Sequence, residues 1–138
     1  MKKLIWWMRI VGSFYVFLFV AAAFLHLPIQ AEGPEGILEH AASGDPVARF
    51  VVDTWVVLGL ELGAIGIALL IASRVPMKAT ALVWLVIGSE LLWGIGSDIY
   101  KLGRGYPLHV SALWILIHSV IIVTGFLALR SQTLETGK

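Results

Sequence analysis

The sequence contains no cysteine. This absence excludes disulfides, thiolate nucleophiles, iron–sulfur clusters and zinc sites built from cysteine. Charged residues are scarce as well, because Asp, Glu, Lys and Arg make up 14% of the chain against about a quarter in a soluble domain. With a net charge of +1 and no stripe of basic residues, the chain lacks the charge pattern of a nucleic-acid-binding protein, and we predict no nucleic-acid partner.

Motifs of soluble enzymes and of metal bundles are also missing. The sequence has no glycine-rich phosphate loop, no Gly-x-Ser-x-Gly elbow and no His-Glu-x-x-His motif. It also lacks the Glu-x-x-His pairs of di-metal helix bundles, so we predict no metal site. His26 and His109 fall near predicted helix ends, where histidines are more often interfacial than haem ligands, so we predict no cofactor.

Hydrophobic residues make up 59% of the chain and lie in long runs. Since about 20 apolar residues cross a bilayer as a helix, the runs predict an all-α, antiparallel four-helix bundle in a membrane, as one transmembrane domain over 1–138. The first run is longer than the apolar part of a signal peptide and is therefore interpreted as a retained helix. The predicted spans are about 4–27, 47–73, 79–99 and 108–129.

The segment 28–46 is rich in glycine, proline and acidic residues, which predicts a loop on the solvent side of the membrane. Pro34 and Gly44 bracket a short amphipathic helix within it. Most Lys and Arg residues flank the opposite side, so the positive-inside rule predicts cytoplasmic termini and, in a bacterial cell, an inner-membrane location. The basic residues on that side are Lys2, Lys3, Arg9, Arg74, Lys78, Arg130 and Lys138.

Ionisable residues interrupt the apolar runs. Glu61 lies inside the second run, where an ionised carboxylate costs roughly 3 kcal/mol on membrane-insertion scales. Placing the spans by depth at ~1.5 Å per residue predicts two polar layers, each with one residue from every helix. The central layer holds Tyr15, Glu61, Glu90 and His118, and the outer layer holds His26, Asp53, Asp98 and His109.

Glu61 also lies on the helix face opposite a ridge of small residues, since two positions correspond to a rotation of ~200°. This ridge would let a neighbouring backbone approach closely. It consists of Gly59, Gly63 and Gly66.

The layers admit a structural hypothesis and three functional ones. The polar groups could simply bond one another and hold the helices in register. They could instead bind the polar end of a small hydrophobic or amphiphilic molecule from the bilayer and exchange protons with it, whether in an enzyme or a carrier. They could form a proton or cation relay. The protein could also be an accessory subunit that docks on a membrane-protein partner, or on a second copy, through the glycine ridge.

Three stretches carry a resemblance to a known family. They are WWMRIVGSFY (6–15), LELGAIGIALLIASR (60–74) and ELLWGIGSDIYKLGRGY (90–106). In these the chain resembles the BphX-like family of small bacterial membrane proteins, and DoxX-like families are similar in layout. The resemblance implies a bacterial inner membrane and apolar aromatic ligands. It implies no catalytic residue.

Overall fold

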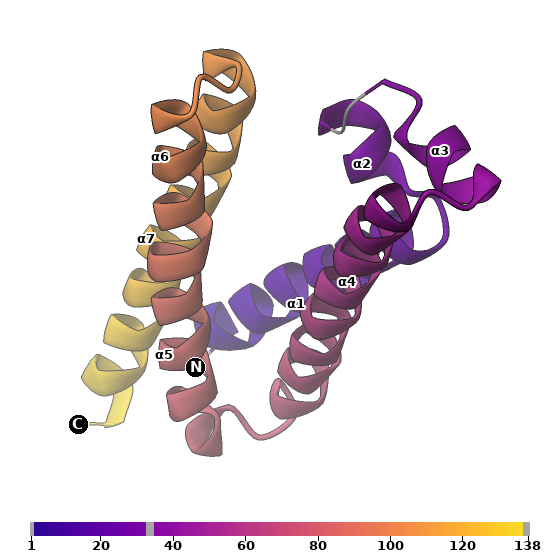
Figure 1. Cartoon of the computed structure of the whole chain (residues 1–138). Coiled ribbons are helices and arrows are strands. Elements are labelled where there is room, and N and C mark those ends of the chain that lie inside the picture. The colour runs from indigo at the N-terminus through magenta and orange to yellow at the C-terminus, as the bar shows by residue number, and fades with distance from the viewer. Residues whose placement is uncertain (1, 33–34, 137–138) are drawn as a thin grey trace. The chain divides into compact units, whose positions relative to one another are not determined.

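The computed structural model describes residues 2–32 and 35–136, and within these ranges all regular secondary structure is helical (Figure 1). The long helices are joined by short ones and by turns. In chain order the elements are α1 (Lys2–Ala23), α2 (Leu27–Glu32), α3 (Ile37–Ser43), α4 (Pro46–Ala72), the 3₁₀ turn η1 (Pro76–Lys78), α5 (Thr80–Ser89), the π-helical segment η2 (Glu90–Ile95), α6 (Gly96–Gly103) and α7 (Leu108–Thr136).

Four helical stretches are long and apolar enough to cross a membrane: Lys2–Ala23, Pro46–Ala72, Thr80–Gly103 and Leu108–Ser131. The third is continuous because α5, η2 and α6 follow one another without a break. Many large apolar side chains on these helices are exposed, as expected where lipid replaces water. For the residues that the structure describes, the prediction of an all-α fold with four helices long and apolar enough to span a membrane is confirmed.

The chain forms two compact units. The ridge unit is Ile10–Leu70, and the hairpin unit combines Met1–Arg9 with Ile71–Lys138. The predicted bundle of all four spans in one domain over 1–138 stays a prediction.

In the ridge unit, α1 and α4 pack antiparallel through the predicted glycine ridge. A Cβ added at Gly66 would lie 2.7 Å from the carbonyl oxygen of Gly12, and one added at Gly59 would lie 2.7 Å from the Cβ of Ala22. Gly63 packs against the Phe19 ring in the same way. The ridge thus serves close packing of two helices within this chain.

Two short helices, α2 and α3, precede α4 in the ridge unit, where the sequence predicted one amphipathic helix (Figure 1). Pro34, the predicted start of that helix, lies outside the described residues. α3 ends at Ser43 and is capped by Gly44, whose φ of 101° is left-handed and favours glycine. Asp45 then caps α4: its Oδ1 accepts from the backbone N–H groups of Val47 (2.8 Å) and Ala48 (3.0 Å). These two hydrogen bonds lower the pKa of the Asp45 carboxyl, and the bond from Ala48 has the larger effect.

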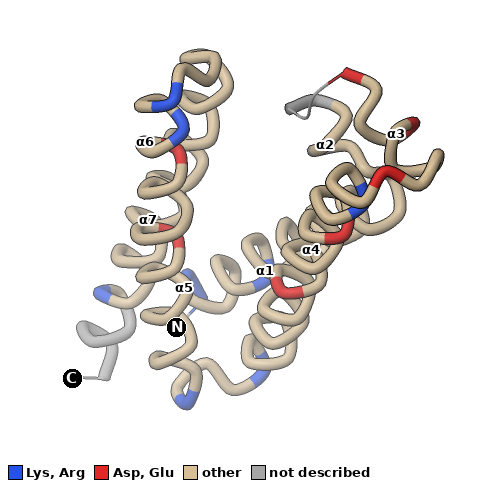
Figure 2. The backbone as a smooth tube through the Cα atoms, viewed as in Figure 1, with Lys and Arg blue, Asp and Glu red and all other residues tan. Residues whose placement is uncertain are grey.

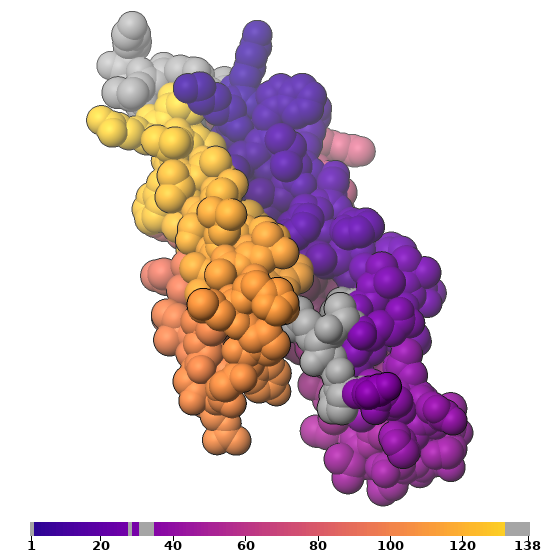
Figure 3. Space-filling view, turned by 90° about the horizontal axis from the view of Figure 1, so that it is seen from above, coloured from indigo at the N-terminus to yellow at the C-terminus, as the bar shows by residue number. Residues whose placement is uncertain are grey.

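In the hairpin unit, α5, η2 and α6 run antiparallel to α7. The Trp84 and Phe126 rings meet edge to face at 5.1 Å between centroids. The first residues of α1 belong to the same unit, and Figure 3 shows them (indigo) against the C-terminal part of α7 (yellow). There the indole N–H of Trp7 points at the carbonyl of Ile121 and the hydroxyl of Thr124, both at 3.1 Å.

Replacing Gly66 by alanine tests whether α1 and α4 pack closely through the glycine ridge. Because the added Cβ would meet a backbone oxygen, which cannot rotate away, we expect a loss of about 1–3 kcal/mol of unfolding free energy. The measurement is thermal or denaturant unfolding of the purified protein in detergent.

Gly88→Ala is the matched control, because Gly88 also lies within an apolar helix, but a Cβ added there would have no atom within 4 Å beyond its chain neighbours and its own helix backbone. The control should be neutral or slightly stabilising, since alanine is the better helix former. Equal stability of the two variants would contradict close packing at Gly66.

Candidate acid–histidine site

The site begins with the π-helical segment η2, which starts at Glu90. In a regular α-helix, the eight positions from Glu90 to Asp98 correspond to a rotation of ~800°, which leaves the two side chains about 80° apart. A π-turn takes up one extra residue, so the same stretch rotates roughly as seven α-helical residues do, about 20° short of two full turns. The π-turn therefore brings Glu90 and Asp98 onto one face of the helix, toward α7.

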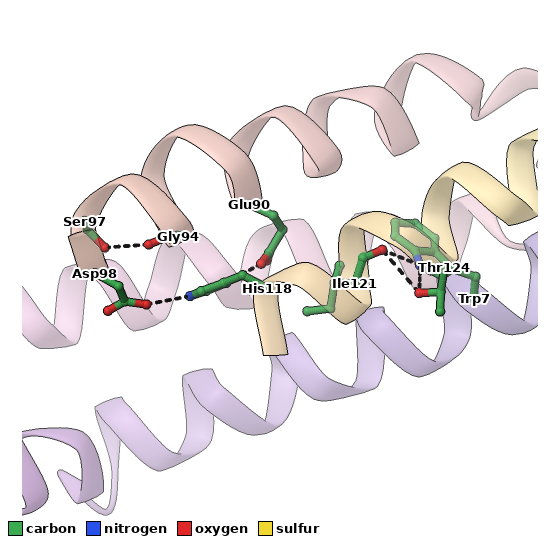
Figure 4. Close-up of polar contacts among 8 residues, drawn as sticks. All are labelled: Trp7, Glu90, Gly94, Ser97, Asp98, His118, Ile121 and Thr124. Atoms are coloured by element: carbon green, nitrogen blue, oxygen red, sulfur yellow. Dashed lines mark hydrogen bonds and ion pairs between the residues drawn. The ribbon is translucent and has the colours of Figure 1, made fainter. Parts of the chain in front are cut away.

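His118 projects from the middle of α7 into this face (Figure 4). Its ring fits because position 94 lacks a side chain: a Cβ added at Gly94 would lie 2.6 Å from the ring nitrogen Nδ1. The hydroxyl of Ser97 donates to the Gly94 carbonyl at 3.0 Å and occupies a backbone acceptor at this turn. Trp114, one turn earlier on α7, stacks beside the imidazole with 28° between the ring planes.

Both ring nitrogens of His118 face a carboxylate (Figure 4). Nδ1 forms a hydrogen bond with Oε2 of Glu90, and Nε2 lies 3.6 Å from Oδ2 of Asp98. The other oxygen of Asp98, Oδ1, lies 3.6 Å from Nζ of Lys101. The four side chains form an ordered series, from Glu90 through His118 and Asp98 to Lys101.

The carboxylates are deeply buried, with 6% of Glu90 and 2% of Asp98 exposed. The His118 side chain is 14% exposed. In the described part of the chain, one buried side-chain oxygen has no hydrogen-bond partner, and it is Oδ2 of Asp98. Its separation of 3.6 Å from Nε2 of His118 is an ion-pair distance and too long for a hydrogen bond.

This geometry restricts where protons can lie. A neutral imidazole has one N–H and one acceptor nitrogen, whereas an ionised carboxylate only accepts hydrogen bonds. Both ring contacts are therefore favourable either when the ring carries two protons or when one carboxyl group is protonated. The two arrangements contain the same number of protons, so the cluster can pass a proton between ring and carboxyl at constant net charge.

The remaining predicted site residues are described within their own parts of the chain. Tyr15 is buried in the ridge unit, whereas Glu61 and Asp53 are exposed on α4. His26 adopts a left-handed conformation with φ of 50° between α1 and α2, and His109 is exposed in the first turn of α7. From the predicted layers the structure brings together Glu90 and His118, and it adds Asp98. The proximity of Tyr15 and Glu61 to this cluster stays a prediction.

Sequence reasoning did not single out Gly94, Lys101 or Trp114. The spacing of Glu90, Gly94 and Asp98 at intervals of four was a partial signal, because each step of four places the next side chain only ~40° further around a helix. Among residues 2–32 and 35–136, no three His, Asp or Glu side chains are grouped so as to hold a metal ion.

The fold and this cluster define a small membrane protein with paired carboxylates and a histidine inside its apolar helices. A sequence model of the BphX-like family matches residues 1–133, and the chain belongs to that family. It is 30% identical over 135 residues to an uncharacterised BphX-like protein of Burkholderia cepacia. The alignment covers 91% of this chain and 92% of that relative. An uncharacterised BphX-like protein of Paraburkholderia xenovorans (strain LB400) matches with the same identity and coverage. No solved structure gave a significant match.

Replacing Gly94 by alanine should disrupt the cluster, because the new methyl group would overlap the His118 ring. We expect the ¹⁵N resonances of His118 to lose the signature of a ring bonded at Nδ1, while the helix content stays near that of the parent. The measurement is NMR of protein labelled with ¹⁵N-histidine in lipid nanodiscs.

Gly96→Ala is the control for the same segment, since an added Cβ there meets its nearest atom at 3.8 Å, an ordinary contact. Its histidine spectrum should match that of the parent. An unchanged His118 signal in Gly94→Ala would show that the ring does not depend on the space at position 94.

Proposed function

We propose that this protein binds a small hydrophobic or amphiphilic molecule from the bilayer and exchanges a proton with its polar end at the Glu90–His118–Asp98 cluster. The observation that carries the proposal is His118, held on both ring nitrogens between two buried carboxylates. Within this group a proton can move between the ring and a carboxyl group at constant net charge, and donating one proton to a ligand lowers the net charge of the cluster by one. Intramembrane ionisable residues of this kind commonly mark substrate or proton pathways.

The surroundings support access from lipid. The π-helical segment that begins with Glu90 exposes Leu91, Leu92 and Trp93 to the apolar phase. A molecule dissolved in the bilayer would therefore meet an apolar helix surface one residue away from a buried carboxylate. A hydrophobic body would favour this surface, and a polar end would favour the cluster.

Native mass spectrometry of protein purified from membranes tests the proposal. We expect the parent to retain a small apolar molecule and a His118→Gln variant to retain at least tenfold less, because glutamine cannot bond to both carboxylates while exchanging a proton. His109→Gln is the matched control, since it makes the same change at an exposed position on the same helix.

Equal retention by both variants would contradict the assigned site. A ligand-free parent that purifies with a larger membrane complex would favour the accessory-subunit hypothesis instead.

A second candidate function is a proton relay, which the order Glu90, His118, Asp98, Lys101 favours. Lys101 lies near the end of α6, where the membrane interface is expected, so the series would connect that interface with the interior. An imidazole can take up a proton at one ring nitrogen and release one at the other.

Proton flux in proteoliposomes tests the relay, with an entrapped pH dye as the readout and a potassium gradient as the driving force. We expect Asp98→Asn to reduce flux at least tenfold and Asp53→Asn, the same change at an exposed site of α4, to leave it unchanged. No flux above protein-free vesicles in the parent would exclude the relay and leave the ligand-binding proposal standing.

We further propose an inner-membrane location with cytoplasmic termini. In the hairpin unit, the basic residues lie toward the ends of the helices, and the acidic residues of α5–α6 lie between them (Figure 2). The end with the N-terminus and the η1 turn holds more Lys and Arg than the α6 end, which contributes Lys101 and Arg104. By the positive-inside rule, the richer end faces the cytoplasm.

A further inference from the structure

Oδ2 of Asp98 is a buried acceptor without a donor among the described residues. Leaving such an oxygen unpaired is unfavourable, so a bound molecule that supplies a hydrogen-bond donor would be held by it. The neighbouring Nε2 of His118 is near enough to share the same bound atom. These two atoms define the recognition point of the cluster.

The charge around Asp98 indicates which donor fits. Lys101 faces Oδ1 of Asp98, and His118 faces Oδ2. The whole series therefore contains two acidic side chains, Glu90 and Asp98, and two basic ones, His118 and Lys101. An ammonium group would add a positive charge to a buried site whose carboxylates already face basic groups, which is costly in a low-dielectric environment. A neutral donor avoids this cost.

The distance between the two atoms favours a hydroxyl group. A hydroxyl oxygen can donate one hydrogen bond and accept another. Nε2 of His118 and Oδ2 of Asp98 are 3.6 Å apart, so an oxygen ~2.8 Å from each would form an Nε2···O···Oδ2 angle of about 80°. A hydroxyl at this position could donate to Oδ2 and accept from Nε2–H. An ether oxygen cannot donate, and an ammonium group cannot accept.

On the basis of the proposed function, we infer that the site recognises a neutral hydroxyl group on an apolar body, with Asp98 as acceptor and His118 as donor. The hydroxyl could belong to a free alcohol within the bilayer or to a lipid headgroup, because α6 ends five residues after Asp98, within about 8 Å along the helix axis. The chemistry is the same in both cases.

The experiment uses three probes with the same chain and different heads: 1-decanol, decylamine and decyl methyl ether. The full-length protein, labelled with ¹⁵N-histidine, is titrated in phosphatidylcholine nanodiscs, whose headgroups carry no hydroxyl. The shift of the His118 ring signal gives each affinity, and His118→Gln assigns that signal. We expect decanol to bind at least tenfold more tightly than the ether and the amine.

Asp98→Asn should remove most of this preference, and Asp53→Asn, at an exposed position, should retain it. The comparison of probes on the parent protein stands even where Asp98→Asn fails to fold. A second arm uses phosphatidylglycerol nanodiscs without probe: a shift of His118 there would identify a lipid headgroup as the source of the hydroxyl.

Other outcomes overturn the inference in distinct ways. Equal binding of decanol and ether would show that no hydroxyl donor is recognised, and tighter binding of decylamine would make the ligand a cation. In both cases the ligand-binding proposal would stand. No response of His118 to any probe or to phosphatidylglycerol would overturn the inference, whereas retention of a molecule in native mass spectrometry would still support the proposed function.

Discussion

The interaction on which the hairpin unit depends is the pairing of His118 with two buried carboxylates. An ionised side chain within an apolar helix costs several kcal/mol unless a partner compensates for the lost water. Glu90 and Asp98 lie on one helix and share a single partner on another. This favours one register of α7 against α5 and α6, because a shift by a full helical turn, ~5.4 Å, would take the imidazole away from at least one of the two carboxylates.

The π-turn and the glycine within it follow from this pairing. Without the extra residue, Glu90 and Asp98 would diverge around the helix, and one of them would turn toward lipid. Without the gap at Gly94, the imidazole could not reach between them. Both features weaken an ordinary helix, since a π-turn and a mid-helix glycine are each less favourable than a regular turn with alanine. Here they place two acids around one base.

The sequence predicted the helices well and the site in part. Long apolar runs determine membrane spans almost directly, because every backbone group in lipid must be bonded within a helix. Depth along the helices pointed to Glu90 and His118 as neighbours, since depth depends only on residue count. Asp98 was assigned to the outer layer because it lies eight residues, ~12 Å, along the helix from Glu90. Depth alone did not show that the His118 ring reaches both carboxylates, and the π-turn that brings them onto one face has no reliable sequence signal. Within the ridge unit, Glu61 is exposed while Gly59 and Gly63 are buried, and its predicted place in the central polar layer stays a prediction.

The magnitudes separate a structural role of the cluster from a functional one. An interhelical hydrogen bond within a membrane contributes on average only ~0.6 kcal/mol, which one pair between Glu90 and His118 already supplies. Asp98 places a second buried carboxylate beside the His118 ring, and its Oδ2 has no hydrogen bond to the described residues. A buried acceptor without a hydrogen bond costs ~1–3 kcal/mol. A device for helix register alone would be more stable with an apolar residue at position 98. The second carboxylate is better explained by a bound donor that completes its hydrogen bonding than by the stability of the helix pair.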